Sequence, residues 1–134
     1  MGRIIGGVMQ RRRFILGGVV ALAGGPALAG PRLAEPGLRL MMVRRPGCVY
    51  CAQWDREIAP VYASRPEGRA APLFMVDVDG PYPDGLALDR RPWLTPTFIL
   101  LRGGQEVTRF EGYPGADKFF GVLRAMLDEA RSRG

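Results

Sequence analysis

The sequence predicts a single α/β domain in which a mixed β-sheet is flanked by helices. Two apolar runs of strand length are separated by a segment with helical spacing, which is the order of a right-handed parallel crossover. Two further strand-like runs are joined by the turn Arg102-Gly103-Gly104-Gln105, whose glycines are typical of a hairpin, and an amphipathic helix follows. Parallel and antiparallel pairs therefore share one sheet.

The first 29 residues have the layout of a secretory signal peptide. Arg3 and the cluster Arg11-Arg12-Arg13 supply positive charge without any acid, an apolar run leads to Leu28, and Ala27-Leu28-Ala29 is a typical cleavage sequence. The arginine cluster also resembles a twin-arginine export motif, so Sec and Tat export both stay open. We expect cleavage after Ala29 and a periplasmic product, with an uncleaved, membrane-tethered form as the alternative.

Removal of this segment changes the charge of the chain. The full sequence carries 19 basic and 13 acidic residues, and four of the arginines lie before residue 30. Fifteen basic residues against thirteen acids leave the mature part at a net charge of +2, and no basic face interleaved with aromatic side chains is present. We therefore expect no nucleic-acid partner.

The mature chain is expected to begin with an unstructured lead-in, residues 30–37, followed by the domain over residues 38–131. The mostly apolar first strand, 38–43, suits a central strand covered on both faces. The helix over 49–63 places Trp54 in an apolar stripe shared with Val61, so Trp54 is interpreted as a core residue, and Pro60 is expected to kink the helix.

A polar turn over residues 64–71 then leads to a second buried strand, 72–78. Residues 79–93 are too rich in proline and glycine for a long helix, and at most a helical turn is expected near 86–89. The remaining elements are a strand from 95 to 101, its hairpin partner from 106 to 111 and the last helix from 116 to 131.

Both cysteines of the chain lie in Cys48-Val49-Tyr50-Cys51, between the first strand and the first helix. Only a thiolate attacks a disulfide sulfur, and the free N–H groups in the first turn of a helix stabilise a thiolate. Arg44 and Arg45 precede the motif and are expected to add positive potential. We therefore predict that Cys48 attacks to form a mixed disulfide and that Cys51, one turn further and more buried, resolves it.

Other uses of the two cysteines are less favoured. A structural disulfide over so short a loop removes little entropy from the unfolded chain. Zinc requires about four ligands, and the chain offers two thiols and no histidine, so neither a metal nor another cofactor is expected. A binding module that holds a peptide or Cu(I) without turnover stays open, with Met41 and Met42 near the thiols.

The order of elements resembles the thioredoxin superfamily over nearly all of residues 38–131, with Cys48-x-x-Cys51 after the first strand and Thr95-Pro96 opening the third. The resemblance implies a minimal thioredoxin-like fold with a four-stranded sheet in the order 2-1-3-4. It also implies that Pro96 is a cis proline packed close to Cys48, and that the backbone of Thr95 pairs with an extended substrate segment. An ordinary trans proline is the alternative.

The site residues that follow from the motif and the resemblance fall into two groups. We expect the catalytic group to be Cys48, Cys51 and Pro96. We expect the substrate-binding group to be Tyr50, Trp93 and Thr95.

Within this superfamily the sequence is most similar to small periplasmic thioredoxins of SoxS type, which are associated with bacterial sulfur oxidation. The likeness lies in residues 48–51, in residues 54–62 and in Phe110-Glu111-Gly112-Tyr113. It implies an exported thiol-disulfide oxidoreductase that reduces a thiol of a sulfur-oxidation protein. An upstream electron donor, such as a membrane thiol transporter, is also implied, with membrane contact only during export or in an uncleaved form. General thiol reduction, for cytochrome c maturation or disulfide repair, is the alternative.

Three departures from thioredoxin itself affect the chemistry. Gly47 stands where thioredoxin has tryptophan, and Met42 and Met75 stand where it has a buried carboxylate and its lysine partner. We therefore expect that water, or a nearby acid such as Glu57, takes the proton from Cys51, or that the resolving step is slow. We expect a reduction potential more oxidising than that of thioredoxin, because the helix end and the two arginines favour the thiolate.

Overall fold

The computed structural model describes residues 37–134. The predicted signal peptide and nearly all of the predicted lead-in lie outside the described residues. No helix within residues 37–134 is long and apolar enough to cross a membrane.

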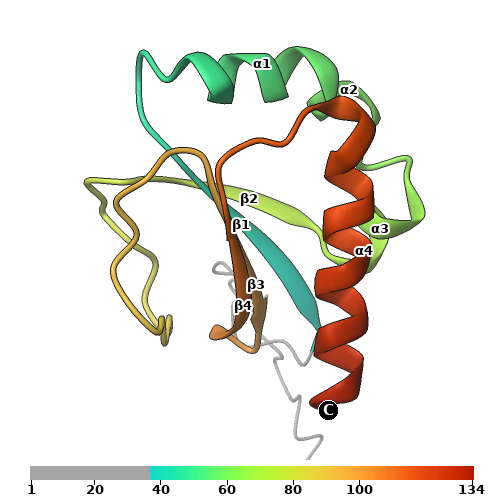
Figure 1. Cartoon of the computed structure of the whole chain (residues 1–134). Coiled ribbons are helices and arrows are strands. Elements are labelled where there is room, and N and C mark those ends of the chain that lie inside the picture. The colour runs from blue at the N-terminus through green and yellow to red at the C-terminus, as the bar shows by residue number, and fades with distance from the viewer. Residues whose placement is uncertain (1–36) are drawn as a thin grey trace, which may run out of the picture.

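A four-stranded mixed sheet in the order β2-β1-β3-β4 forms the centre of the molecule (Figure 1). β1 (Leu38–Arg44) pairs in parallel with β2 (Leu73–Asp77) and antiparallel with β3 (Thr97–Arg102). β4 (Gln105–Glu111) pairs antiparallel with β3 at the far edge. Both the fold class and the strand order predicted from the sequence are confirmed.

β1 lies at the centre of two apolar layers. Leu40, Met41, Met42 and Val43 are all fully buried. Because adjacent residues of a strand face opposite sides of a sheet, Leu40 and Met42 pack in one layer and Met41 and Val43 in the other. The prediction of a first strand covered on both faces is confirmed.

The helices supply the apolar cover of one face. They are α1 (Val49–Glu57), α2 (Ala59–Tyr62), α3 (Pro66–Ala70) and α4 (Ala116–Ser132). The ring of Trp54 lies 6.0 Å from those of Phe98 and Phe119, measured between centroids, and its side chain is fully buried. The interpretation of Trp54 as a core residue is confirmed.

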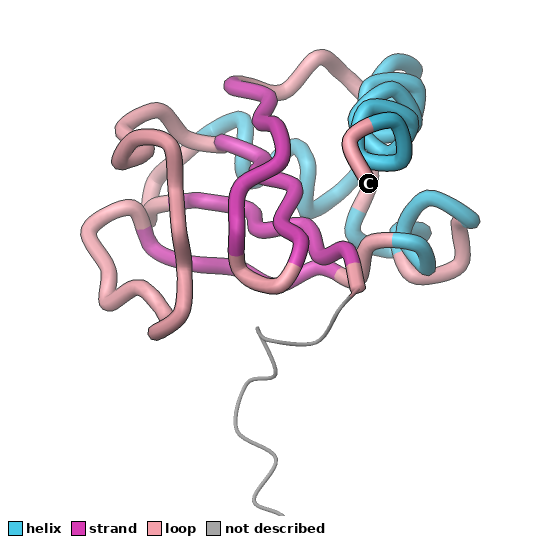
Figure 2. The backbone as a smooth tube through the Cα atoms, turned by 90° about the horizontal axis from the view of Figure 1, so that it is seen from below, coloured by secondary structure: helices cyan, strands magenta, loops and turns pink. Residues whose placement is uncertain are grey.

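A long segment between β2 and β3, not a helix, covers the opposite face. Figure 2 shows the strands between this loop segment and helices α3 and α4. Tyr82, Leu86 and Leu88 of the segment pack against the buried layer that contains Met41 and Val43. The hydroxyl of Tyr82 donates a hydrogen bond to the carbonyl of Val78 at 2.8 Å, which folds the start of the segment back on the end of β2.

The single helix predicted over residues 49–63 is wrong in one respect, because it is divided in two. α1 ends at Glu57, and α2 begins at Ala59 with Pro60 in its first turn. Proline is compatible with a first turn because its missing N–H would lack an intrahelical partner there. Pro60 therefore marks a new helix, and Val61, expected in the apolar stripe, is 42% exposed.

Two connecting segments depend on distant contacts, and the prediction for the first of them is wrong. Residues 64–71, expected to be a turn, contain α3, whose Glu67 forms a 2.6 Å ion pair with Arg124 of α4. Near residues 86–89, where at most a helical turn was expected, none forms, and Ala87 makes a bridge with Gln105, the first residue of β4. In both places the stabilising partner lies far away in the sequence.

Candidate active site

The end of β1 and the start of α1 place the two cysteines. After Arg44 the chain makes a tight turn in which the N–H of Cys48 donates to the carbonyl of Arg45 at 3.3 Å. Gly47 completes the turn with φ +77°, in the left-handed region that favours glycine. Cys48 is the N-cap of α1, and its sulfur forms a disulfide with that of Cys51.

The two sulfurs differ in exposure and in hydrogen bonding. Cys48 is half-buried, whereas Cys51, in the first turn of α1, is fully buried. The backbone N–H of Cys51 donates to Sγ of Cys48 at 3.2 Å. A negative charge on that sulfur in the reduced protein would be stabilised by this donor and by the positive end of the helix dipole.

The two arginines before the motif have different surroundings. The guanidinium of Arg44 donates two hydrogen bonds of 2.7 Å to the carboxylate of Asp55 on α1. This hydrogen bonding holds the pKa of Asp55 below its usual range and raises that of Arg44. Arg44 therefore ties β1 to α1, and its expected contribution to the potential at Cys48 is largely offset by Asp55.

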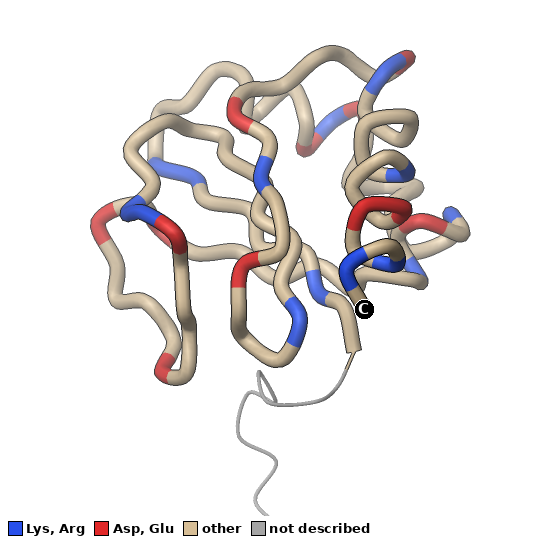
Figure 3. Tube along the Cα trace, turned by 60° about the horizontal axis from the view of Figure 1, so that its bottom comes forward, with Lys and Arg blue, Asp and Glu red and all other residues tan. Residues whose placement is uncertain are grey.

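Arg45 has no carboxylate within ion-pair distance among residues 37–134. Basic and acidic residues are interspersed along residues 37–134 and do not form separate regions of one charge (Figure 3). The positive potential expected near the motif is thus left mainly to Arg45.

The segment before β3 lies beside the cysteine motif. Val43 of β1 pairs with Thr97 of β3, so the residues that follow Val43 and those that precede Thr97 meet at one end of the sheet. Nη2 of Arg45 donates to the carbonyl of Trp93 at 3.4 Å across this junction. The peptide bond between Thr95 and Pro96 is cis, the conformation that the resemblance implies.

Large apolar side chains are exposed in the same two segments. Tyr50 and Trp93, which the sequence analysis named, are 59% and 66% exposed. Val49 and Leu94, which it did not name as contacts, are exposed beside them in the chain. Their position within the cysteine motif and next to Trp93 is the signal that would have identified them.

Glu57 lies further along α1 than Cys51 and is hydrogen-bonded to two other side chains. It follows Cys51 by six residues on α1, which is about 9 Å along a helix axis. Its carboxylate accepts hydrogen bonds from the hydroxyl of Tyr113 and from Gln53, and the first of these does most to lower the pKa of Glu57. The proton transfer from Cys51 to Glu57 therefore stays a prediction, and the hydrogen bonds that engage Glu57 favour water as the acceptor.

The buried positions behind the cysteines are apolar. Met42 is fully buried in the layer that contains Cys51 and Trp54. The described residues contain no group of three or more histidine, cysteine, aspartate or glutamate side chains placed to hold a metal ion.

A known structure with the same architecture decides the family. The crystal structure of the reduced periplasmic thioredoxin SoxS from Paracoccus pantotrophus is 49% identical to this chain, with a TM-score of 0.68. The match covers 69% of this chain and 98% of that one. The chain belongs to the thioredoxin superfamily. With its Cys48-Cys51 pair, it is a dithiol-disulfide oxidoreductase of that superfamily, whose members act on protein thiols and disulfides.

More distant members share the fold. A thioredoxin-fold protein from Helicobacter pylori is 17% identical, with a TM-score of 0.55 and a match over 71% of each chain. Thioredoxin from Trypanosoma brucei brucei is 19% identical, with a TM-score of 0.50 and a match over 75% of this chain and 80% of that one. No protein-family model and no curated protein sequence matches the chain.

Proposed function

We propose that this protein is an exported thiol-disulfide oxidoreductase that reduces a disulfide on a periplasmic sulfur-oxidation protein and so frees a thiol of that protein. The observation that carries the proposal is the asymmetric cysteine pair at the start of α1, in a chain 49% identical to a periplasmic thioredoxin. The identity supports a periplasmic location and a partner of the kind implied for SoxS-type thioredoxins. General thiol reduction in the same compartment is the alternative.

The proposed reaction begins with the reduced protein. The thiolate of Cys48 attacks one sulfur of a partner disulfide, forming a mixed disulfide while the other partner sulfur leaves as a thiolate. Cys51 then loses its proton to water, and its thiolate attacks Sγ of Cys48. The first partner sulfur leaves as a thiolate, and the Cys48–Cys51 disulfide forms. Two electrons pass to the partner, and an upstream electron donor, such as a membrane thiol transporter, must restore the two thiols.

We assign the partner contacts to the two segments that meet beside Cys48. An extended partner segment would pair with the backbone of Thr95, next to the cis Pro96, by strand addition. The exposed rings of Tyr50 and Trp93 would cover the partner residues on either side of its cysteine. This arrangement gives Pro96 the role of shaping the groove.

Export by the predicted signal peptide belongs to the same proposal. The expected result is a periplasmic protein whose mass corresponds to a chain that begins at Gly30. Mass spectrometry of the periplasmic fraction measures this directly. A full-length protein that stays in the membrane fraction would instead support the tethered form.

Partner capture tests the proposed function. The Cys51→Ser variant, exported in cells that contain the sulfur-oxidation system, should accumulate a covalent complex that a reductant releases, because the mixed disulfide can no longer be resolved. Cys48→Ser is the matched control and should form no such complex. Identification of the released protein as a sulfur carrier is the expected result.

Two other outcomes would count against the proposal. A cytochrome maturation protein or a broad mixture of proteins in the complex would favour the general reductase. A complete lack of covalent complex, under conditions in which a thioredoxin control traps its target, would contradict a disulfide-exchange role for Cys48.

A further inference from the structure

Residues 87–94, here called the wall segment, lead directly into the cis Thr95–Pro96 bond and carry Trp93. Most of the segment is irregular, so its position beside the cysteines depends on contacts with other elements. Its first contact is the bridge at Ala87, whose N–H donates to the carbonyl of Gly104 and whose carbonyl accepts from the N–H of Glu106, each at 2.9 Å. Its last contacts are those of Trp93 with Arg45 and of Leu94 with Thr97.

A buried ion pair on β4 holds the middle of the wall segment. Nε and Nη2 of Arg109 donate to the two carboxylate oxygens of Glu106, at 2.6 and 2.8 Å. The two side chains are only 6% and 1% exposed. The pair faces the same side of the sheet as the segment, because Arg109 pairs with Ile99 and Glu106 with Leu101.

A β-bulge brings these two side chains to one face. Residues three apart on a regular strand point to opposite faces of a sheet. The register between β3 and β4 shifts at Leu100/Leu101, so that one extra residue, Val107, is accommodated on β4. Glu106 and Arg109 therefore point the same way, which the spacing alone would not predict.

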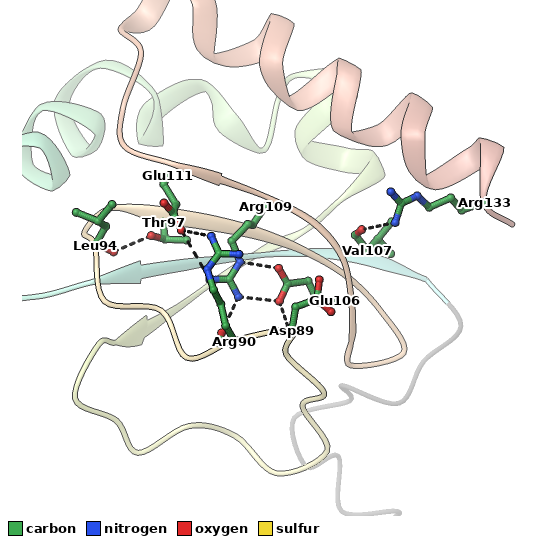
Figure 4. Close-up of polar contacts among 9 residues, drawn as sticks. All are labelled: Asp89, Arg90, Leu94, Thr97, Glu106, Val107, Arg109, Glu111 and Arg133. Carbon is green, nitrogen blue, oxygen red and sulfur yellow. Dashed lines mark hydrogen bonds and ion pairs between the residues drawn. The ribbon is translucent and has the colours of Figure 1, made fainter.

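The ion pair contacts the main chain of the wall segment at two consecutive residues (Figure 4). Oε2 of Glu106 accepts a hydrogen bond from the N–H of Asp89 at 2.9 Å, and Nη2 of Arg109 donates to the carbonyl of Arg90 at 2.7 Å. Since both contacts are to backbone atoms, they fix the path of the chain whatever side chains it carries. Arg90 lies three residues before Trp93.

The energetics of a buried ion pair favour a role in positioning the backbone over a role in stabilising the fold. Burial of two charges is costly, and an apolar pair of similar volume often gives equal or greater stability. Nη1 of Arg109 is buried, makes no hydrogen bond within the described part of the chain and lies 4.0 Å from Oε1 of Glu111. What the ion pair provides that an apolar pair cannot is the pair of directed contacts to Asp89 and Arg90.

We propose that Glu106 and Arg109 are positioning residues for partner binding: they hold the wall segment so that Trp93 and Thr95 present a preformed surface beside Cys48. This inference rests on the proposed function, in which those residues contact the partner. A preformed surface lowers the ordering cost of binding a protein, whereas a small disulfide needs only access to Cys48. Loss of the positioning contacts should therefore affect large substrates selectively.

The Arg109→Lys variant separates positioning from charge. Its single ammonium keeps a positive charge beside Glu106, but it cannot reproduce the fork that contacts Glu106 and the carbonyl of Arg90 together. We expect the KM for insulin, reduced with dithiothreitol as electron source, to rise about three- to tenfold with kcat little changed. The rate with 5,5′-dithiobis(2-nitrobenzoate) and the reduction potential should stay at wild-type values.

A second variant covers the case in which Arg109→Lys does not fold. The double variant Glu106→Leu/Arg109→Met replaces the buried charges by apolar side chains, which often preserves stability. It also removes both contacts to the wall segment, so the KM for insulin should rise at least as much as in Arg109→Lys. The matched control is Arg124→Lys, which alters an arginine paired with a different buried glutamate, Glu67, on the helical face. Its KM for insulin should not change.

An unchanged KM for insulin in either folded variant would overturn the inference. So would an equal loss of rate with the small disulfide, or an equal rise in KM for Arg124→Lys, because both would indicate a general structural effect. If the wild-type protein itself failed to reduce insulin, the inference of a preformed surface for large disulfide substrates would be overturned, whereas the proposed function would still be decided by partner capture.

Discussion

At the residue scale, the two cysteines show how position divides one chemistry into two roles. They are the same residue type, three apart, yet one caps α1 at the surface and the other is fully buried. The sequence alone predicted this asymmetry, because the strand-then-helix pattern around a Cys-x-x-Cys motif specifies which cysteine starts the helix. Their assignment as nucleophile and resolver stays a prediction.

Gly47 is the residue whose backbone conformation the motif depends on most. Its φ of +77° is unfavourable for a residue with a Cβ, although a Cβ there would meet no atom within 4 Å. Gly47→Ala should therefore destabilise the protein by about 1 kcal/mol through backbone strain alone. Urea unfolding of the oxidised protein measures this. Equal midpoints for the two proteins would show that the turn accepts the substitution.

Glu57 provides a test of which group accepts the proton from Cys51. Because Glu57 lies about 9 Å along α1 from Cys51 and is engaged by Tyr113 and Gln53, Glu57→Gln should change the resolving rate by less than about twofold. Stopped-flow measurement of mixed-disulfide decay gives this rate. A tenfold slower decay in the variant would mean that the carboxylate does reach the proton, directly or through water.

At the element scale, the parts predicted well are those stabilised by their own pattern. β1 and α4 each bury an apolar face that is visible in the local sequence, and both were found nearly where expected. α3 was missed because its Glu67 is paired with Arg124 on a helix far along the chain. The wall segment was missed for the same kind of reason, since β4 holds it through Glu106 and Arg109.

The acid stability of the fold should depend on Glu106. Burial alone raises the pKa of Glu106, but the hydrogen bonds from Arg109 and from the N–H of Asp89 outweigh burial and leave the pKa below its usual range. A carboxyl of this kind binds its proton more readily in the unfolded chain. Its contribution to stability is therefore complete above its unfolded pKa, about 4.3, and is lost as the pH falls through the lower folded value.

The Glu106→Gln variant should accordingly lose less stability than the wild type between pH 5 and pH 3, which are values on either side of the usual glutamate pKa of about 4.3. Asp55, whose pKa is also lowered, remains in both proteins and leaves some acid dependence. Urea unfolding at several pH values gives the two slopes. Identical slopes would show that the Glu106–Arg109 pair adds nothing to acid sensitivity.

At the scale of the whole molecule, the sheet brings the two halves of the site together. The cysteine motif and the cis-proline segment are almost fifty residues apart in the chain, yet the pairing of Val43 with Thr97 makes them neighbours. The resemblance to a known superfamily was needed to predict this neighbourhood. Composition and periodicity predicted the elements, but neither could predict which strand ends would meet or which arginine would be paired.

The face of the sheet opposite the helices is covered by a segment whose position the sequence did not predict. Helices flank the sheet as expected, and in the described residues an irregular segment supplies the apolar cover of the second face. This segment continues into the wall segment beside Cys48. The packing of the second face is therefore linked to the shape of the proposed partner surface. The residues that make this link are Glu106 and Arg109. Their position on one face of the sheet can be recognised only when the bulge in β4 is known.

The measurement that tests the central claim most directly is the alkylation of the reduced protein by iodoacetamide across a range of pH, followed by peptide mapping. If Cys48 is the attacking thiolate at the start of α1 and Cys51 is the buried resolver, Cys48 alone should be modified rapidly. The apparent pKa of that reaction should lie below the ordinary cysteine value of about 8.5. Equally rapid modification of Cys51, or an apparent pKa for Cys48 at or above that value, would contradict the account.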